Sequence, residues 1–308
     1  MKGSPQVTLF AIALLVLSMA CSMLLLRQLD KTRPVATLQE TLFISSPKVL
    51  QRMSLGYSGL LADIYWTRAV QYFGGHHVAG AEHYNLLAPL LEITTTLDPH
   101  LLPAYEFGSS FLTAQPPNGA GMPEKAVELM ENGIRNNPSE WRLYFNLGFI
   151  YYMELKNPNK AADAFIRGSK LPNAHPLLKV MAARMADAAG DTLTSQMMWK
   201  LTYDTSTDKL VRANAAAHLT ALIVDAQVGE LESVVARYQI VSGRTPATFS
   251  ELVRAGMLMG IPTDPVGNPY VLTPDGRVEV KDPDKLPFIK MGKPLGYKAP
   301  DLPKLPTD

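Results

Sequence analysis

The strongest constraint on the fold of this chain is a pair of short apolar segments between two prolines. Pro138 and Pro172 are 34 residues apart and bracket both segments. In the first, the i, i+3, i+4, i+7 spacing of one helix face is occupied by Tyr144, Leu147, Gly148, Tyr151 and Leu155. In the second, it is occupied by Ala161, Ala164, Phe165 and Gly168. Because small residues alternate with large ones, the segments are expected to pack closely as antiparallel helices.

A weaker copy of this hairpin precedes it. Pro99 and Pro138 are 39 residues apart, and the loop 115–122 can absorb the excess length. Helical patterns also occur from Pro47 to residue 73, from 82 to 97, from 177 to 189, from 194 to 203 and from 209 to 228, with breaks expected at residues 74–77 and 190–191. The sequence therefore predicts a mainly α array of hairpins over residues 47–228, in which each contacts its neighbours.

Residues 97–172 resemble the tetratricopeptide-repeat family. The resemblance rests on Leu147, Gly148, Tyr151, Ala161, Phe165 and Pro172. Gly168 stands where the family usually has alanine. A generic array of helical hairpins would give nearly the same pattern.

The tetratricopeptide resemblance implies a solenoid whose concave face binds a protein or peptide. It assigns these positions to that face: Tyr105, Ser109, Thr113, Arg142, Phe145, Phe149, Tyr152 and Met153. Aromatic anchors with a few polar groups suit a peptide groove. Alternatively, the N-terminal hairpin at 47–97 or the C-terminal domain covers this stripe.

The N-terminal segment, residues 1–26, contains 20 consecutive uncharged residues from Val7 to Leu26. That length can cross a lipid bilayer as a helix. We favour an uncleaved anchor, because the apolar run continues beyond a small-residue site at Ala20. The alternatives are a cleaved signal peptide and a lipoprotein acylated at Cys21. Residues 27–46 are expected to form a tether.

Residues 229–281 have a different pattern, which predicts a small α+β domain. A short helix near 249–258 precedes a strand from Tyr270, a turn at 274–276 and a returning strand at 277–281. This segment resembles the globular tail of type II secretion major pseudopilins. The shared positions are Tyr238, Gly243, Pro246, Glu251, Leu252, Pro262, Asp264, Pro265, Gly267, Pro269 and Tyr270.

Two departures limit what the pseudopilin resemblance implies. The chain lacks the Asp- and Ser-rich calcium loop of those proteins, so no metal site is expected. It also lacks a glutamate at the start of the apolar segment, so polymerisation as a pilin is not expected. The last segment, 282–308, is rich in proline and lysine. Such a tail can pack over the domain through Leu286, Phe288 and Leu295.

Charge and motif content exclude several functions. The 29 Lys and Arg residues balance 28 Asp and Glu residues, and no basic stripe suggests nucleic-acid binding. His76, His77 and His83 form the only local histidine cluster, which is weak support for a metal site. No nucleophile motif or phosphate-binding loop stands out, so neither an enzyme nor a cofactor is expected.

These observations predict a single-pass inner-membrane protein with an exported, periplasmic body. Residues 7–26 would contact the bilayer, and the helical array would act as a scaffold in assembling a pilus, secretion system or other envelope machine. One alternative is a filament-associated subunit that uses its pseudopilin-like end for packing. Another is a hydrolase with a helical accessory domain.

Overall fold

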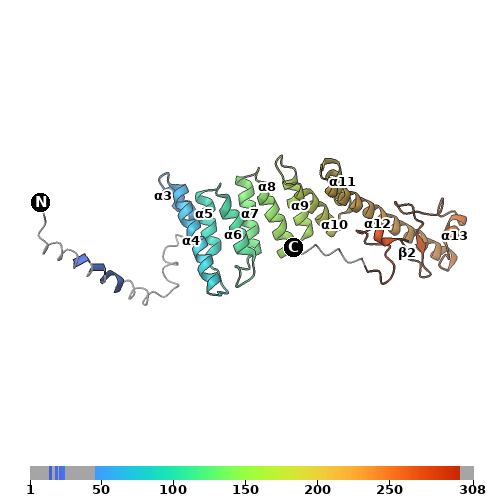
Figure 1. The fold of residues 1–308 in the computed structure, drawn as a ribbon, viewed down its shortest axis with the longest axis horizontal. Coiled ribbons are helices and arrows are strands. Elements are labelled where there is room, and N and C mark those ends of the chain that lie inside the picture. The colour runs from blue at the N-terminus through green and yellow to red at the C-terminus, as the bar shows by residue number, and fades with distance from the viewer. Residues whose placement is uncertain (1–13, 16–17, 20, 25–45, 299–308) are drawn as a thin grey trace, which may run out of the picture. The chain divides into compact units, whose positions relative to one another are not determined.

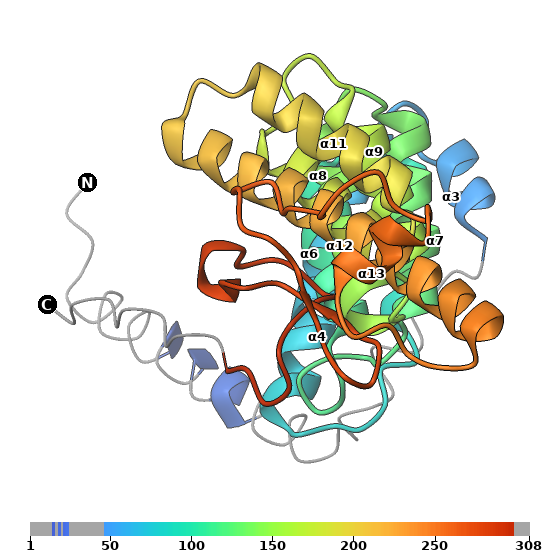
Figure 2. The same cartoon turned by 90° about the vertical axis from the view of Figure 1, so that its right-hand side faces the viewer.

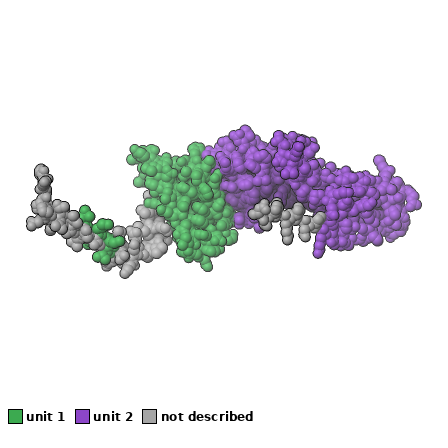
Figure 3. All heavy atoms as spheres, viewed as in Figure 1, with its two compact units in different colours: residues 1–129 green, residues 130–308 purple. Residues whose placement is uncertain are grey.

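The computed structural model describes residues 14–15, 18–19, 21–24 and 46–298. The protein is mainly helical, as predicted, and divides into an N-terminal unit of residues 1–129 and a C-terminal unit of residues 130–308 (Figure 3). Most of the predicted anchor and tether lies outside the described residues. Within the described ones, no helix combines the length and apolarity that crossing a bilayer requires.

The N-terminal unit is built from consecutive helices joined by turns (Figure 1). They are α3 (Pro47–Met53), α4 (Ser58–Val78), α5 (Leu87–Leu97) and α6 (Leu102–Thr113), followed by α7 (Pro123–Asn136), in which the boundary between the units falls. Helix α5 contacts α3, α4 and α6. Gly108 permits the close approach of α6 to α5, because a Cβ at this position would lie only 2.7 Å from Leu91 Cδ2.

Two predictions about the first helices are wrong. The pattern starting at Pro47 breaks at the turn 54–57, where Leu55 and Gly56 have φ of 49° and 95°. The predicted break at residues 74–77 does not occur, and α4 continues to Val78. Each helical glycine costs only about 1 kcal/mol. Beyond the two glycines, the His76 and His77 rings pack on Tyr72 and Phe73, with ring centroids 4.0 and 5.7 Å apart.

The C-terminal unit continues with helices that each pack against the next (Figure 1). They are α8 (Trp141–Phe149), the π-helix η1 (Ile150–Glu154), α9 (Pro158–Ser169), α10 (Leu177–Ala188), α11 (Thr192–Thr205) and α12 (Lys209–Ser242). The Asn157 side chain caps α9 by accepting from Lys160 N at 3.0 Å. Proline at the first position of α9 ends the preceding helix and starts this one.

The predicted pairing of α8 with α9 is confirmed. Phe165 is fully buried, and Tyr151 packs against the same core cluster. Gly148 lies against the Phe165 ring so closely that a Cβ would be 2.5 Å from Cε1. Small residues therefore set the separation of the two helices, as the sequence indicated.

The C-terminal part of this unit packs along α12 (Figure 2). It comprises α13 (Phe249–Arg254), the antiparallel strands β1 (Val271–Leu272) and β2 (Val278–Glu279), and the 3₁₀ helix η2 (Pro283–Lys285). The predicted hairpin is thus present. Helix α12 does not break at Gly229, because Val228 and Leu231 are buried in one core on either side of it.

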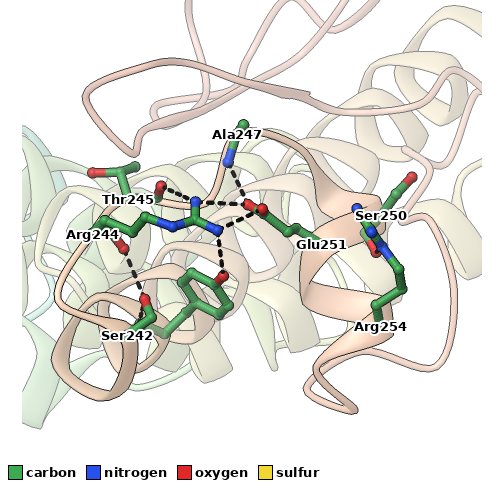
Figure 4. Close-up of polar contacts among 8 residues, drawn as sticks. Ser242, Arg244, Thr245, Ala247, Ser250, Glu251 and Arg254 are labelled. Atoms are coloured by element: carbon green, nitrogen blue, oxygen red, sulfur yellow. Dashed lines mark hydrogen bonds and ion pairs between the residues drawn. The ribbon is translucent and has the colours of Figure 1, made fainter.

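A compact polar network fixes the turn from α12 to α13 (Figure 4). The Arg244 guanidinium donates to both carboxylate oxygens of Glu251 at 2.7 and 3.2 Å, and to the Tyr238 hydroxyl at 3.2 Å. Ala247 N also donates to Glu251, at 2.8 Å. The hydrogen bonds from Arg244 and Ala247 lower the pKa of Glu251 to about 2. Tyr238 and Glu251 therefore take part in stabilising a turn.

Asp264 has a similar structural role in the next loop. It is buried and accepts from the backbone N–H groups of Val266 and Asn268 at 3.1 and 2.8 Å. Gly267 supplies the positive φ of 91° that this turn requires. The Asp-Pro-Val-Gly sequence is thus turn chemistry rather than a site.

Candidate functional site: an aromatic stripe and its pocket

The eight residues expected to line a groove are divided between the two units. The N-terminal unit holds Tyr105, Ser109 and Thr113 on α6, and the C-terminal unit holds the other five on α8 and η1. Tyr105 and Ser109 are buried, and Thr113 is half-buried. The Tyr105 hydroxyl donates to Pro99 O at 3.1 Å. Tyr105 and Ser109 are core residues, which corrects the expectation that they face a ligand.

In the C-terminal unit, aromatic side chains follow one face of α8 into η1. We call Trp141, Phe145, Phe149 and Tyr152 the aromatic stripe. The ring centroids of Trp141 and Phe145 are 6.1 Å apart, and those of Phe145 and Phe149 are 4.7 Å apart. Phe145 and Phe149 are half-buried and pack on the core that contains Phe165. The stripe therefore contributes to the core while part of each ring remains accessible.

The π-helix changes which side chains reach solvent at the end of the stripe. Leu155 N donates to Ile150 O at 3.1 Å, five residues back, so this turn holds an extra residue. Tyr152 and Met153 are 37% and 51% exposed. Single π-helical turns inside α-helices occur frequently at functional sites. Of the predicted residues, these two are the most available apolar contacts.

Arg142, the charged residue expected to face a ligand, is exposed but already forms an ion pair with Glu140. Its guanidinium lies 3.1 Å from Glu140 Oε1 and 5.1 Å from the centre of the Trp141 ring. An exposed ion pair of this kind contributes little to stability. Its effect is to hold a charged group beside the start of the stripe.

A pocket of about 300 Å³ adjoins Tyr152. It is lined by Tyr152 of η1, Arg184, Met185, Asp187 and Ala188 of α10, Trp199 of α11, His218 of α12 and Phe288. Ligand-binding pockets combine apolar walls with a few polar groups, and this one is lined about equally by apolar and polar surface. Here the polar groups are an exposed guanidinium, a half-buried carboxylate and an imidazole.

Three stacked rings form one wall of the pocket. The His218 ring lies between Trp199 and Phe288, with centroid distances of 4.0 and 3.7 Å and interplanar angles of 6° and 8°. Sequence reasoning missed this stack, because its members are far apart in the chain. The only signal was Phe288 in the tail, which was expected to pack on the domain and does.

Residues 286–290, which follow η2, pack against α12 and form polar contacts with α10 and α12. Leu286 and Ile289 are buried in the core along α12. Lys290 Nζ lies 2.6 Å from Asp187 Oδ1, and the backbone N–H of Lys290 donates to Asp225 Oδ1 at 2.8 Å. Leu295, by contrast, is exposed. These contacts hold Phe288 in the pocket wall and place a lysine–aspartate pair at its rim.

The stability of the protein is expected to fall as the pH falls through the titration of His218. Burial, as the main cause, lowers the pKa of His218 from 6.5 to about 4; Asp187 opposes this shift and Arg184 adds to it. Between these two values the unfolded chain binds a proton that the folded chain does not, so stability is lost as pH drops from about 6.5 toward 4. Thermal midpoints at pH 7 and pH 5 measure this loss.

A matched variant isolates the contribution of His218 to the pH dependence of the thermal midpoint. His218→Phe keeps an aromatic ring in the stack but cannot titrate, so its midpoint should change less between the two pH values. An equal change in both proteins would contradict the assignment to His218.

Within residues 46–298, no cluster of three or more His, Cys, Asp or Glu side chains has the arrangement of a metal site. His76 and His77 belong to the last turns of α4, where His76 Nδ1 lies 2.9 Å from Tyr72 O.

No protein-family model matches the sequence, and no curated protein is significantly similar to it.

Proposed function

We propose that this protein is a membrane-anchored scaffold of the tetratricopeptide-repeat type, which binds a segment of a partner protein during assembly of an envelope machine. Residues 7–26 would anchor it in the inner membrane, with the body exported to the periplasm. The aromatic stripe and its pocket would be the binding surface. The observation that carries the proposal is the pocket beside the exposed Tyr152.

A repeated contact supports the helical-repeat interpretation. The Tyr105 hydroxyl donates to Pro99 O and the Tyr144 hydroxyl to Pro138 O, each at 3.1 Å and each six residues back. The two tyrosines, like the two prolines, are 39 residues apart. The first helix of each pair also has a glycine at a close contact: Gly108 of α6 faces Leu91 of α5 and, less closely, Leu129 of α7, and Gly148 of α8 faces Phe165 of α9.

The chemistry of the surface favours a peptide with an apolar side chain and polar backbone. Phe288, which is 37% exposed, offers apolar contact at the pocket, and the exposed guanidinium of Arg184 can pair with a polar group of a ligand. Met185 and Trp199 line the pocket as buried side chains, and Asp187 already pairs with Lys290. Aromatic anchors surrounded by polar groups are typical of residues that dominate binding energy. The stripe extends this contact along α8.

Site-specific photocrosslinking of the full-length protein in cells tests this function. A benzophenone amino acid at Tyr152 is expected to give a discrete protein adduct. Tyr203 is the matched control, because it is also 37% exposed but lies outside the pocket. Arg184→Ala should weaken the adduct at position 152 without changing the helical circular dichroism. The same adducts at both positions, or an adduct insensitive to Arg184→Ala, would count against the pocket as the binding surface.

A further inference from the structure

The turn between α3 and α4 exposes a cluster of large apolar side chains. We call Met53, Leu55, Tyr57 and Leu60 the apolar tip; all four are exposed, and Leu55 is 87% exposed. Val49 on α3 and Ile64 on α4 lie one helical turn behind it and are exposed as well. Scattered exposed apolar residues are ordinary, but several large ones gathered at one turn are typical of an interaction surface.

Leu55 occupies a backbone conformation that does not suit leucine. Its φ of 49° lies in the left-handed region, where glycine and asparagine are favoured. The side chain is exposed and so gains nothing from burial within the described chain. Residues held in such conformations concentrate at functional positions. The leucine side chain is therefore best explained by a contact made outside the fold.

Basic residues accompany the tip. Lys48 and Arg52 are exposed and lie one turn apart on α3. From residue 27 to residue 68 the sequence holds six Lys and Arg residues against three Asp and Glu residues. Apolar side chains flanked by basic ones suit an anionic lipid surface, where each component contributes to binding.

The chain also keeps the tip near the proposed anchor. Only the 20 residues 27–46 separate Leu26 from the first turn of α3. Even fully extended, a chain of that length spans at most about 70 Å. A bilayer that holds residues 7–26 would therefore always be within reach of the tip.

We propose that the apolar tip inserts into the interfacial region of the bilayer and forms a second membrane contact. This inference rests on the membrane anchor of the proposed function. We expect the apolar tip to contact lipid rather than a second copy of the chain or a partner protein. Both the basic residues Lys48 and Arg52 beside it and the short link to the anchor favour lipid. The contact would fix the orientation of the N-terminal unit on the membrane.

The test uses spin labels on the full-length protein in vesicles containing phosphatidylcholine and anionic phosphatidylglycerol. Cys21 is the only cysteine, so Cys21→Ser gives a background in which Leu55→Cys carries a single label. Leu193→Cys is the matched control, because Leu193 is another exposed leucine, at the start of α11. Collision with oxygen, which concentrates in lipid, is compared with collision with a water-soluble nickel chelate.

If the tip inserts into lipid, the ratio of the collision rate with oxygen to that with the nickel chelate should be severalfold higher at residue 55 than at residue 193. Equal ratios would overturn the proposal. A label shielded from both reagents would show that protein covers the tip and would also overturn it. So would spin–spin broadening at residue 55 that dilution with unlabelled protein removes, because that result assigns the tip to contact between copies.

A label on the native Cys21 separates this inference from the anchor. If residue 21 lies deep in lipid while residue 55 is in water, the anchor stands and the tip proposal fails. If residue 55 contacts lipid but residue 21 does not, the tip is a membrane contact and the anchor fails. The variant Leu55→Asn suits the backbone conformation, so the fold should tolerate it. In that background a label introduced by Tyr57→Cys should become more accessible to nickel.

Discussion

Replacing Phe165 by alanine is expected to lower the free energy of unfolding by about 3–5 kcal/mol, the usual cost of removing a large buried aromatic side chain. Phe165 is fully buried and lies where α8 and α9 approach most closely. Its ring centroid is 5.5 Å from Phe149 and 6.2 Å from Phe145. The cavity would therefore remove support from the aromatic stripe as well as from the helix pair.

Urea unfolding of the purified protein, followed by circular dichroism, measures this effect. Phe107→Ala is the matched control, because Phe107 is 55% exposed. Truncation at such a surface position is expected to change stability by about 0.5 kcal/mol or less. Similar losses in the two variants would contradict the assignment of Phe165 as the centre of the hairpin core.

Replacing Gly168 by alanine is expected to cost about 1–3 kcal/mol through overpacking. A Cβ at this position would lie 2.5 Å from Leu178 Cδ2 and 2.7 Å from Tyr144 Cβ. The leucine terminus can move, but the Tyr144 Cβ is fixed by the backbone of α8. This outcome is opposite to the one expected from the tetratricopeptide resemblance, in which alanine is usual here. Thermal midpoints of the wild type and the variant decide between them.

Gly74→Ala is the matched control, because it introduces the same methyl group without a close contact. Gly74 lies inside α4, and a Cβ there would meet nothing within 4 Å. Gly74→Ala should therefore stabilise the protein by up to about 1 kcal/mol, because alanine favours the helix. If Gly168→Ala also stabilised the protein, the close contact with Tyr144 would be wrong.

Part of the site could be predicted because it depends on local order in the chain. The stripe along α8 follows from helical spacing, so the sequence alone places Phe145, Phe149 and Tyr152 on one face. The burial of Tyr105 and Ser109 was not predictable in this way. Periodicity gives the face of a helix but not what covers that face, and both residues lie on a covered face of α6.

The sequence by itself determined the mainly helical class, the α8–α9 hairpin and the β-hairpin, because spacing, prolines and turn residues act over a few positions. Tertiary structure alone decided that α4 and α12 continue through their glycines, since packing outweighs a small local cost. It also decided the pocket. Trp199, His218 and Phe288 meet only after α11, α12 and the C-terminal segment have packed together, and no local pattern encodes that meeting.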